Sequence, residues 1–332
     1  MIVQKIALKN FMVFDNLEIN FNNGVKNNDI NIIIGENGTG KTTLLKCIYA
    51  ACESSNLSTH QNKAKRFQDY FSSSSKSLKE INQKLDDFGL IQVFSRGIEF
   101  HYRAWDDGIM NLNPWLELGI KSVFIPAAEM LSHSKGLVSM ANKYNNIPFD
   151  HTQIDILINA QLWETKDVNK NKKEILQTIE SEIGGKVIYE EDMFYVVKNN
   201  GLKVEFSLEA RGYCKLGLLW KLISNGLLEE NTVLLWDEPE NSLNPELIPM
   251  LVDILFKLSR QGVQIFLATH DYNLMKYFSM KKKDTDSIGF FSLYKTGNGV
   301  FCDCEDDYTL LEHNAIVEAN TQLVRDNIKG VF

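Results

Sequence analysis

The sequence has few cysteines, and they are not arranged in metal-binding or disulfide patterns. The five are Cys47, Cys52, Cys214, Cys302 and Cys304, an odd number without any C-x-x-C spacing. Zinc ribbons and secreted disulfide frameworks both need paired cysteines, so neither is indicated. We therefore expect reduced thiols in a cytoplasmic protein.

Long apolar runs are also missing from the 332 residues. No stretch approaches the roughly 18 consecutive apolar residues that a membrane-spanning helix needs. The opening residues MIVQKIALKNF lack the uninterrupted apolar core of a signal peptide. We expect no membrane partner.

Positive charge is not in excess either. Lys and Arg number 35 against 43 Asp and Glu, which gives a formal net charge of -8. Such a field repels phosphate backbones and disfavours a free-standing, nonspecific DNA binder. DNA binding is thus not indicated by charge, although local basic patches leave it open.

What the sequence does contain is an alternation of short apolar runs with amphipathic segments, which indicates an α/β fold. The runs 233–236 and 263–268 flank a helix-like segment, as buried parallel strands do. Further strands are expected at residues 2–8, 17–21, 30–34, 90–94, 98–103, 121–125, 186–190, 194–197, 203–206, 288–293 and 300–303, and helices at 43–52, 172–183, 213–224 and near the C-terminus.

A phosphate-binding motif follows the apolar run 30–34. Residues 35–42, GENGTGKT, fit G-x-x-x-x-G-K-[ST] between a predicted strand and a predicted helix. Glycines let successive backbone N–H groups face phosphate oxygens at a helix N-terminus, while Lys41 reaches the β- and γ-phosphates and Thr42 binds Mg²⁺. The alternative is a glycine-rich turn without ligand. The candidate nucleotide-binding residues are Gly35, Glu36, Asn37, Gly38, Thr39, Gly40, Lys41, Thr42 and Thr43.

Two adjacent carboxylates end a second apolar run. Asp237 and Glu238 follow VLLW, where the first can hold Mg²⁺ and the second can orient and deprotonate water. Alone this pattern is weak, since a solvated strand end also carries carboxylates. The phosphate loop upstream favours the catalytic interpretation.

These motifs, with 195 residues between Thr42 and Asp237, resemble the ABC-ATPase superfamily. DEPENSLNP, residues 237–245, looks like its acidic motif running into the D-loop, which lies across a dimer interface in that family; an ordinary turn is the alternative. His270 resembles the switch histidine that contacts the γ-phosphate. The resemblance implies head-to-tail pairing of two copies.

The chain departs from transporters at two segments. Instead of LSGGQ it has EARGY at 209–213, where Ala210 and Gly212 would face a neighbour's γ-phosphate and Arg211 or Lys215 would add positive charge in trans. A simple loop before a helix is the alternative. The glutamine of the family's Q-loop is also missing, and Glu129 is our candidate for its role, or else a helix N-terminal charge.

The opening KIALKNF and the GENGTGKT loop resemble the RecF, SMC and OLD branch. FIPAAEMLS, EARGYCKLG and LLWDEPENSLNP look like small bacterial AAA/OLD-like ATPases of phage defence, including PARIS- and Septu-type subunits. We see no heptads for an SMC coiled coil. The acidic residues Asp303 and 305–307 indicate a solvated turn rather than a nuclease centre.

The resemblance implies one ABC-ATPase head over residues 1–332, with a mixed sheet, a P-loop core, an antiparallel β subdomain, an inserted helical lobe and no coiled coil. Its parts are a P-loop half (1–55), a surface insertion (56–90), β-hairpins with the Q-loop-like turn (91–128), a helical and signature lobe (129–225) and a final part with the acidic strand, D-loop, switch histidine and C-terminal hairpin-helix (226–332).

The function we expect is an Mg-ATP-hydrolysing switch that forms a homodimer or higher oligomer and controls a separate effector, a nuclease or toxin. A RecF-like DNA-repair ATPase is the alternative, with Lys63, Lys65, Arg66 or 281–283 as a basic surface. A transporter subunit or a scaffold with little turnover are further options. A transporter subunit should show LSGGQ, which this chain lacks.

Overall fold

A computed structural model describes residues 2–22, 29–56, 67–71, 89–104, 108–110, 112–144, 147–165 and 169–330. The insertion predicted at 56–90 therefore lies largely outside the described residues, as do Lys63, Lys65 and Arg66. All five cysteines are free thiols, as expected. Within the described ranges, no helix combines the length and apolar character needed to cross a bilayer.

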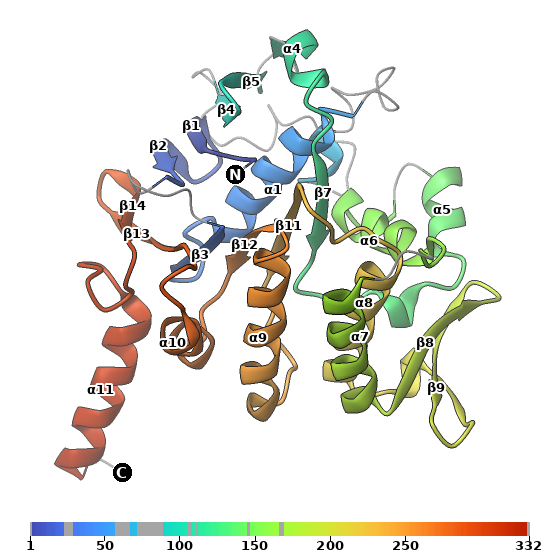
Figure 1. The fold of residues 1–332 in the computed structure, drawn as a ribbon. Coiled ribbons are helices and arrows are strands. Elements are labelled where there is room, and N and C mark those ends of the chain that lie inside the picture. The colour runs from blue at the N-terminus through green and yellow to red at the C-terminus, as the bar shows by residue number, and fades with distance from the viewer. Residues whose placement is uncertain are drawn as a thin grey trace.

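The central element is a six-stranded mixed sheet in the order β14-β13-β3-β12-β11-β7 (Figure 1). Five strands run parallel and only the edge strand β14 is antiparallel. The strands are β3 (Ile30–Gly35), β7 (Lys121–Ile125), β11 (Thr232–Asp237), β12 (Gln264–Ala268), β13 (Ile288–Thr296) and β14 (Gly299–Glu305). The predicted mixed sheet is confirmed.

Both faces of this sheet are covered, which explains its continuous apolar runs. Ile32 and Ile34 of β3 belong to a core with the helices that follow residue 130, whereas Ile33 between them packs with helix α1 on the other face. The helices are α1 (Lys41–Glu53), α5 (Leu137–Lys143), α6 (His151–Gln161), α7 (Lys170–Ile183), α8 (Arg211–Ser224), α9 (Ile248–Ser259) and α10 (Tyr272–Lys281).

A five-stranded antiparallel sheet, β2-β1-β4-β5-β6, contributes to the α1 side of the core. Its strands are β1 (Lys5–Phe11), β2 (Phe14–Asn20), β4 (Leu90–Ser95), β5 (Ile98–Arg103) and β6 (Gly108–Met110). We predicted the first strand at 2–8, but the side-chain Oε1 of Gln264 accepts hydrogen bonds from the backbone N–H groups of Ile2 and Val3. The ladder with β2 therefore starts only at Lys5.

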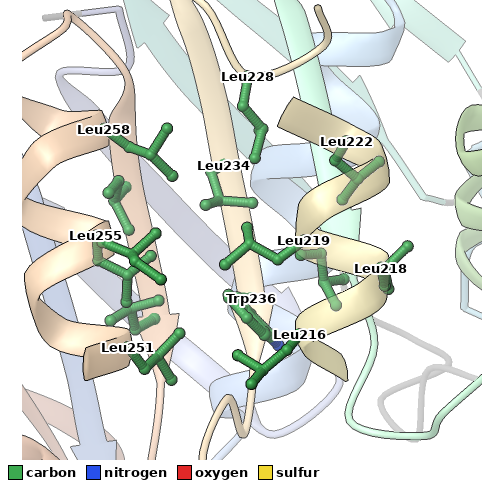
Figure 2. Close-up of a cluster of buried hydrophobic side chains, with 14 of the residues drawn as sticks. Leu216, Leu218, Leu219, Leu222, Leu228, Leu234, Trp236, Leu251, Leu255 and Leu258 are labelled. Carbon is green, nitrogen blue, oxygen red and sulfur yellow. The ribbon is translucent and has the colours of Figure 1, made fainter. Parts of the chain in front are cut away.

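The helical lobe contains a small sheet, β10-β9-β8, at the three β runs predicted there. These strands are β8 (Gly185–Glu190), β9 (Met193–Lys198) and β10 (Lys203–Glu205), and short helical turns η2 (Leu131–His133), η3 (Phe206–Leu208) and η4 (Pro245–Leu247) connect other elements. Figure 2 shows Leu216 and Leu219 of α8 beside Leu234 and Trp236 of β11. Helix α8 is thereby fixed to the acidic strand.

The short elements β6 and helix α4 (Leu112–Leu116) escaped prediction, because three to five residues carry too little periodicity, and helix α10 was also not predicted. At the other end, the predicted C-terminal helix is α11 (Ala315–Lys329), which extends away from the sheet in Figure 1.

Candidate active site

The candidate residues gather at the carboxyl ends of three adjacent parallel strands. Asp237 of β11 is paired with Ala268 of β12, and Ala268 is paired with Ile33 of β3. The phosphate loop, the acidic pair and the turn to His270 therefore leave the sheet at one edge. Ligands of open α/β sheets bind at such an edge.

The phosphate loop depends on glycine at two points. Gly40 has φ 93°, and a Cβ there would lie 2.4 Å from the Phe14 ring. Gly35 has φ 144°, and its Cβ would lie 2.2 Å from the Leu293 carbonyl oxygen. Side chains at either position would displace the loop, so the motif's glycines are steric requirements here.

Lys41 is buried at the start of α1 and crosses the loop. Its Nζ donates to the carbonyl oxygens of Gly35 at 2.7 Å and Glu36 at 3.0 Å. Burial lowers the pKa of Lys41, and the carboxylates of Asp237 and Glu238 oppose that shift. Glu36, Asn37 and Gly38 form the exposed rim of the loop, whereas Thr39 is buried and Thr43 half-buried.

Thr42 and Asp237 are the two predicted metal ligands, and although they belong to different motifs their side chains are in direct contact. The Thr42 hydroxyl donates to Asp237 Oδ2 at 2.8 Å. Burial raises the pKa of Asp237, so a nearby cation would stabilise its carboxylate. A hydroxyl and a carboxylate are the oxygen donors that Mg²⁺ prefers, and the pair fits this ion.

Glu238 follows with an unusual backbone. Its φ is 47°, which is rare for a residue with a side chain, and its N–H donates to Ala268 O at 2.8 Å. Its carboxylate Oε1 lies 3.4 Å from His270 Nδ1, and its side chain is 31% exposed. Both groups are therefore reachable from solvent, close to each other and above the strand ends.

Glu240 is a site residue that the sequence reasoning missed. Its Oε1 accepts from the Thr269 hydroxyl at 2.7 Å and its burial raises its pKa. Its Oε2 is buried without a hydrogen-bond partner among the described residues. The only sequence signal was a third acid in the run DEPE, which gives no hint that it turns inward.

Lys215, which we expected to act in trans on a neighbour, is instead buried within its own chain. Its side chain is 4% exposed, and Nζ donates to the backbone carbonyl of Glu238 in the same chain at 2.7 Å. Burial lowers the pKa of Lys215 to about 8. Arg211, by contrast, is exposed at the start of α8.

The signature segment lies against the D-loop of its own chain. Ala210 is the N-cap of α8 without a side-chain hydrogen bond, and Gly212, two residues further, is buried. A Cβ on Gly212 would lie 3.0 Å from the Ser242 carbonyl oxygen. The glycine therefore allows close approach of two segments in which Arg211 and Asn241 are exposed.

Glu129 is engaged by its own turn. Its Oε1 accepts from the backbone N–H of Leu131 at 2.6 Å, and Oε2 accepts from the Ser132 hydroxyl. These contacts cap η2, the alternative considered from the sequence. The negative charge of Glu129 also acts on Lys215, where it raises the pKa against the larger lowering effect of burial.

Two family models match the chain. One, described as "ABC transporter", matches residues 19–132. The other, described as "AAA domain, putative AbiEii toxin, Type IV TA system", matches residues 136–276. No curated protein matches the sequence.

Solved structures of SMC heads have a similar fold. An SMC head bound to the C-terminal winged-helix domain of ScpA has a TM-score of 0.50 and 13% identity, over 92% of this chain and 98% of that one. The SMC head domain from Thermotoga maritima has a TM-score of 0.47 and 14% identity, over 91% and 98%. At this identity the first likeness shows the fold alone.

The matched models cover the phosphate loop on one side and the acidic strand, D-loop and His270 on the other. The structure joins these parts at one sheet edge. The chain is a P-loop ATPase of the ABC type.

Proposed function

We propose that this ATPase is a magnesium-dependent switch in which two copies complete each other's ATP sites. The observation that carries the proposal is the meeting of Thr42 with Asp237 beside Glu238 and His270. A hydroxyl and a buried carboxylate that fit Mg²⁺, next to an accessible carboxylate, suit phosphoryl transfer to water.

The residues divide the work by chemistry. Lys41 neutralises charge on the β- and γ-phosphates of bound ATP, and Thr42 with Asp237 would hold Mg²⁺, which supplies further positive charge to the phosphate oxygens. Glu238 orients a water and accepts its proton as the water oxygen bonds to the γ-phosphorus and the bond to the bridging oxygen breaks. His270, beside Glu238, would contact the γ-phosphate.

Self-association is supported by the surface beside this site. Asn241, Ser242 and Asn244 of the D-loop are exposed, and the start of α8 with Ala210 lies next to them. Exposed backbone N–H groups at a helix start attract phosphate. A second copy that docks here would bring its signature segment to the first copy's ATP.

The test is the mass of a hydrolysis-deficient variant. Glu238→Gln with Mg-ATP should sediment as a dimer, because this variant should bind ATP without hydrolysing it. Lys41→Ala, which lacks the phosphate contact, should remain a monomer under the same conditions. A monomeric Glu238→Gln that nonetheless binds ATP in a filter assay would contradict the proposal.

The switch would control a separate effector of the nuclease or toxin class. Support comes from the second family model, whose description names a putative AbiEii toxin of a Type IV TA system. Co-expression with the neighbouring gene tests this proposal. ATP-dependent growth arrest that is altered by Glu238→Gln would support it, and a neighbouring permease gene would contradict it.

A DNA-repair function is the second candidate, and the similarity to an SMC head is compatible with it. Of the predicted basic surface, Lys281 is ion-paired with Asp253 at 2.5 Å, and Lys282 donates to Asp306 O at 3.3 Å. The ion pair reduces the positive charge that Lys281 offers to DNA. Duplex binding that rises with ATP and weakens with salt would favour this candidate.

A further inference from the structure

Three buried residues of helix α8 contact neighbouring segments in different ways. Gly212 lies against the Ser242 carbonyl, Lys215 donates to the Glu238 carbonyl, and Lys221 lies 3.7 Å from the Glu164 carboxylate. The first two face the active site and the third does not. The helix therefore joins the D-loop surface to the acidic turn.

The partner of Lys215 differs from those of Lys172 and Lys221, the two other described lysines that are equally deeply buried outside the phosphate loop. Lys172 and Lys221 are 5% and 4% exposed, and each reaches a carboxylate. Lys215 is equally buried, yet its Nζ donates to a main-chain carbonyl at 2.7 Å. Burying an ammonium group costs free energy, and within the described part of the chain no hydrogen bond to a carboxylate offsets that cost here. This suggests that Lys215 is kept for its contact with the Glu238 main chain.

The carbonyl that Lys215 binds belongs to a strained residue. Glu238 has φ 47°, and conformations of this kind persist only where the surroundings hold them. Two hydrogen bonds do so: the Glu238 N–H donates to Ala268 O, and its C=O accepts from Lys215. Together they hold the peptide units on both sides of the Glu238 Cα and so set the direction of its carboxylate.

The rest of α8 makes this contact stiff. Leu216 and Leu219 pack beside Trp236 and Leu234 of β11, the strand that leads to Glu238 (Figure 2). Movement at the exposed start of α8 is therefore transmitted to Lys215 without an intervening loop.

We infer that Lys215 is a positioning residue that holds Glu238 in its active orientation and couples it to the D-loop end of α8. This inference rests on the proposed role of Glu238 as the base. Lys215 acts within its own chain, through the Glu238 main chain, and does not touch the nucleotide.

The experiment measures kcat and ATP affinity separately. Lys215→Met should lower kcat about 10- to 100-fold, while the Kd for ATP changes less than about twofold, since the phosphate loop is untouched. Lys215→Arg, which keeps a charged donor, should recover part of the lost kcat. Lys221→Met is the matched control, equally buried on the same helix, and should keep a wild-type kcat whatever its melting temperature.

The outcomes separate this inference from the function on which it rests. If Glu238→Gln keeps normal turnover, the proposed base is wrong. If Glu238→Gln is inactive while Lys215→Met keeps the wild-type kcat, only the positioning role is overturned. If Lys215→Met fails to fold, Lys215→Gln replaces it with the same expected loss of kcat, and a wild-type kcat in that variant overturns the inference.

Discussion

The carboxylates at and after the end of β11 and Asp303 in β14 carry similar charge in different surroundings. Asp237 and Glu240 are largely buried, burial raises both pKa values, and Glu240 Oε2 has no hydrogen-bond partner among the described residues. Asp303 instead accepts from the exposed His313 ring at 2.7 Å, and that ring stacks on Tyr294. Carboxylates that are buried at a cost in free energy mark the working site, whereas a carboxylate hydrogen-bonded to an exposed side chain does not.

The largest expected effect separates these two regions directly. Glu238→Gln removes the proposed base and should lower ATP turnover about 10²- to 10⁴-fold. Asp303→Asn is the counterpart in β14 and should leave turnover within about twofold, because its contacts lie outside the site. Steady-state phosphate release checks both variants. A loss of turnover in Asp303→Asn would remove the contrast.

Gly40 and Gly97 have similar positive φ angles but differ in the space around them, so they compare the steric requirements inside and outside the site. Gly40→Ala places a Cβ 2.4 Å from Phe14 at φ 93° and should cost about 2 kcal/mol or more of stability, with weaker ATP binding. Gly97→Ala, at φ 80° with no atom within 4 Å, should cost about 1 kcal/mol and leave ATP binding unchanged. Urea unfolding and ATP titration measure the pair. Equal loss of ATP affinity in both would contradict the steric explanation.

A paired carboxylate should give the smallest effect. Asp286 accepts two hydrogen bonds from Arg260, at 2.8 and 2.7 Å, which hold the pKa of Asp286 below its usual range. A lowered pKa adds stability above the usual carboxyl range, and this stability is lost as the pH falls through the folded-state pKa. Asp286→Asn should thus cost about 1 kcal/mol at neutral pH, and progressively less in acid.

The control for this pair is the exposed Asp284, two residues away. Asp284→Asn should change the free energy of unfolding by less than about 0.5 kcal/mol at every pH. If the stability that Asp286→Asn loses relative to the wild type grew as the pH fell, the predicted pH dependence of the ion pair would be wrong.

Local signals predicted the parts of the fold that local sequence controls. The apolar run before GENGTGKT forms β3, and Pro126 follows the end of β7, because a strand covered on both faces needs such runs and proline ends them. The strand expected at 2–8 begins later because Gln264, more than 250 residues away, binds the first backbone groups. No local pattern contains that contact.

The site shows the same division. Its phosphate loop and Asp237 follow from a motif whose chemistry is local. The sequence gives no sign that Glu240 turns inward or that Lys215 is buried, because this burial arises only when α8 and the D-loop pack together. For this reason we expected Lys215 to act on a neighbour, whereas it is buried within its own chain.

The central claim is that two copies complete each ATP site. ATP turnover per chain, measured over about a 100-fold range of protein concentration, tests it most directly. The account predicts that turnover per chain rises with concentration and then reaches a plateau as dimers saturate. Constant turnover per chain from a species that remains a monomer in Mg-ATP would contradict it.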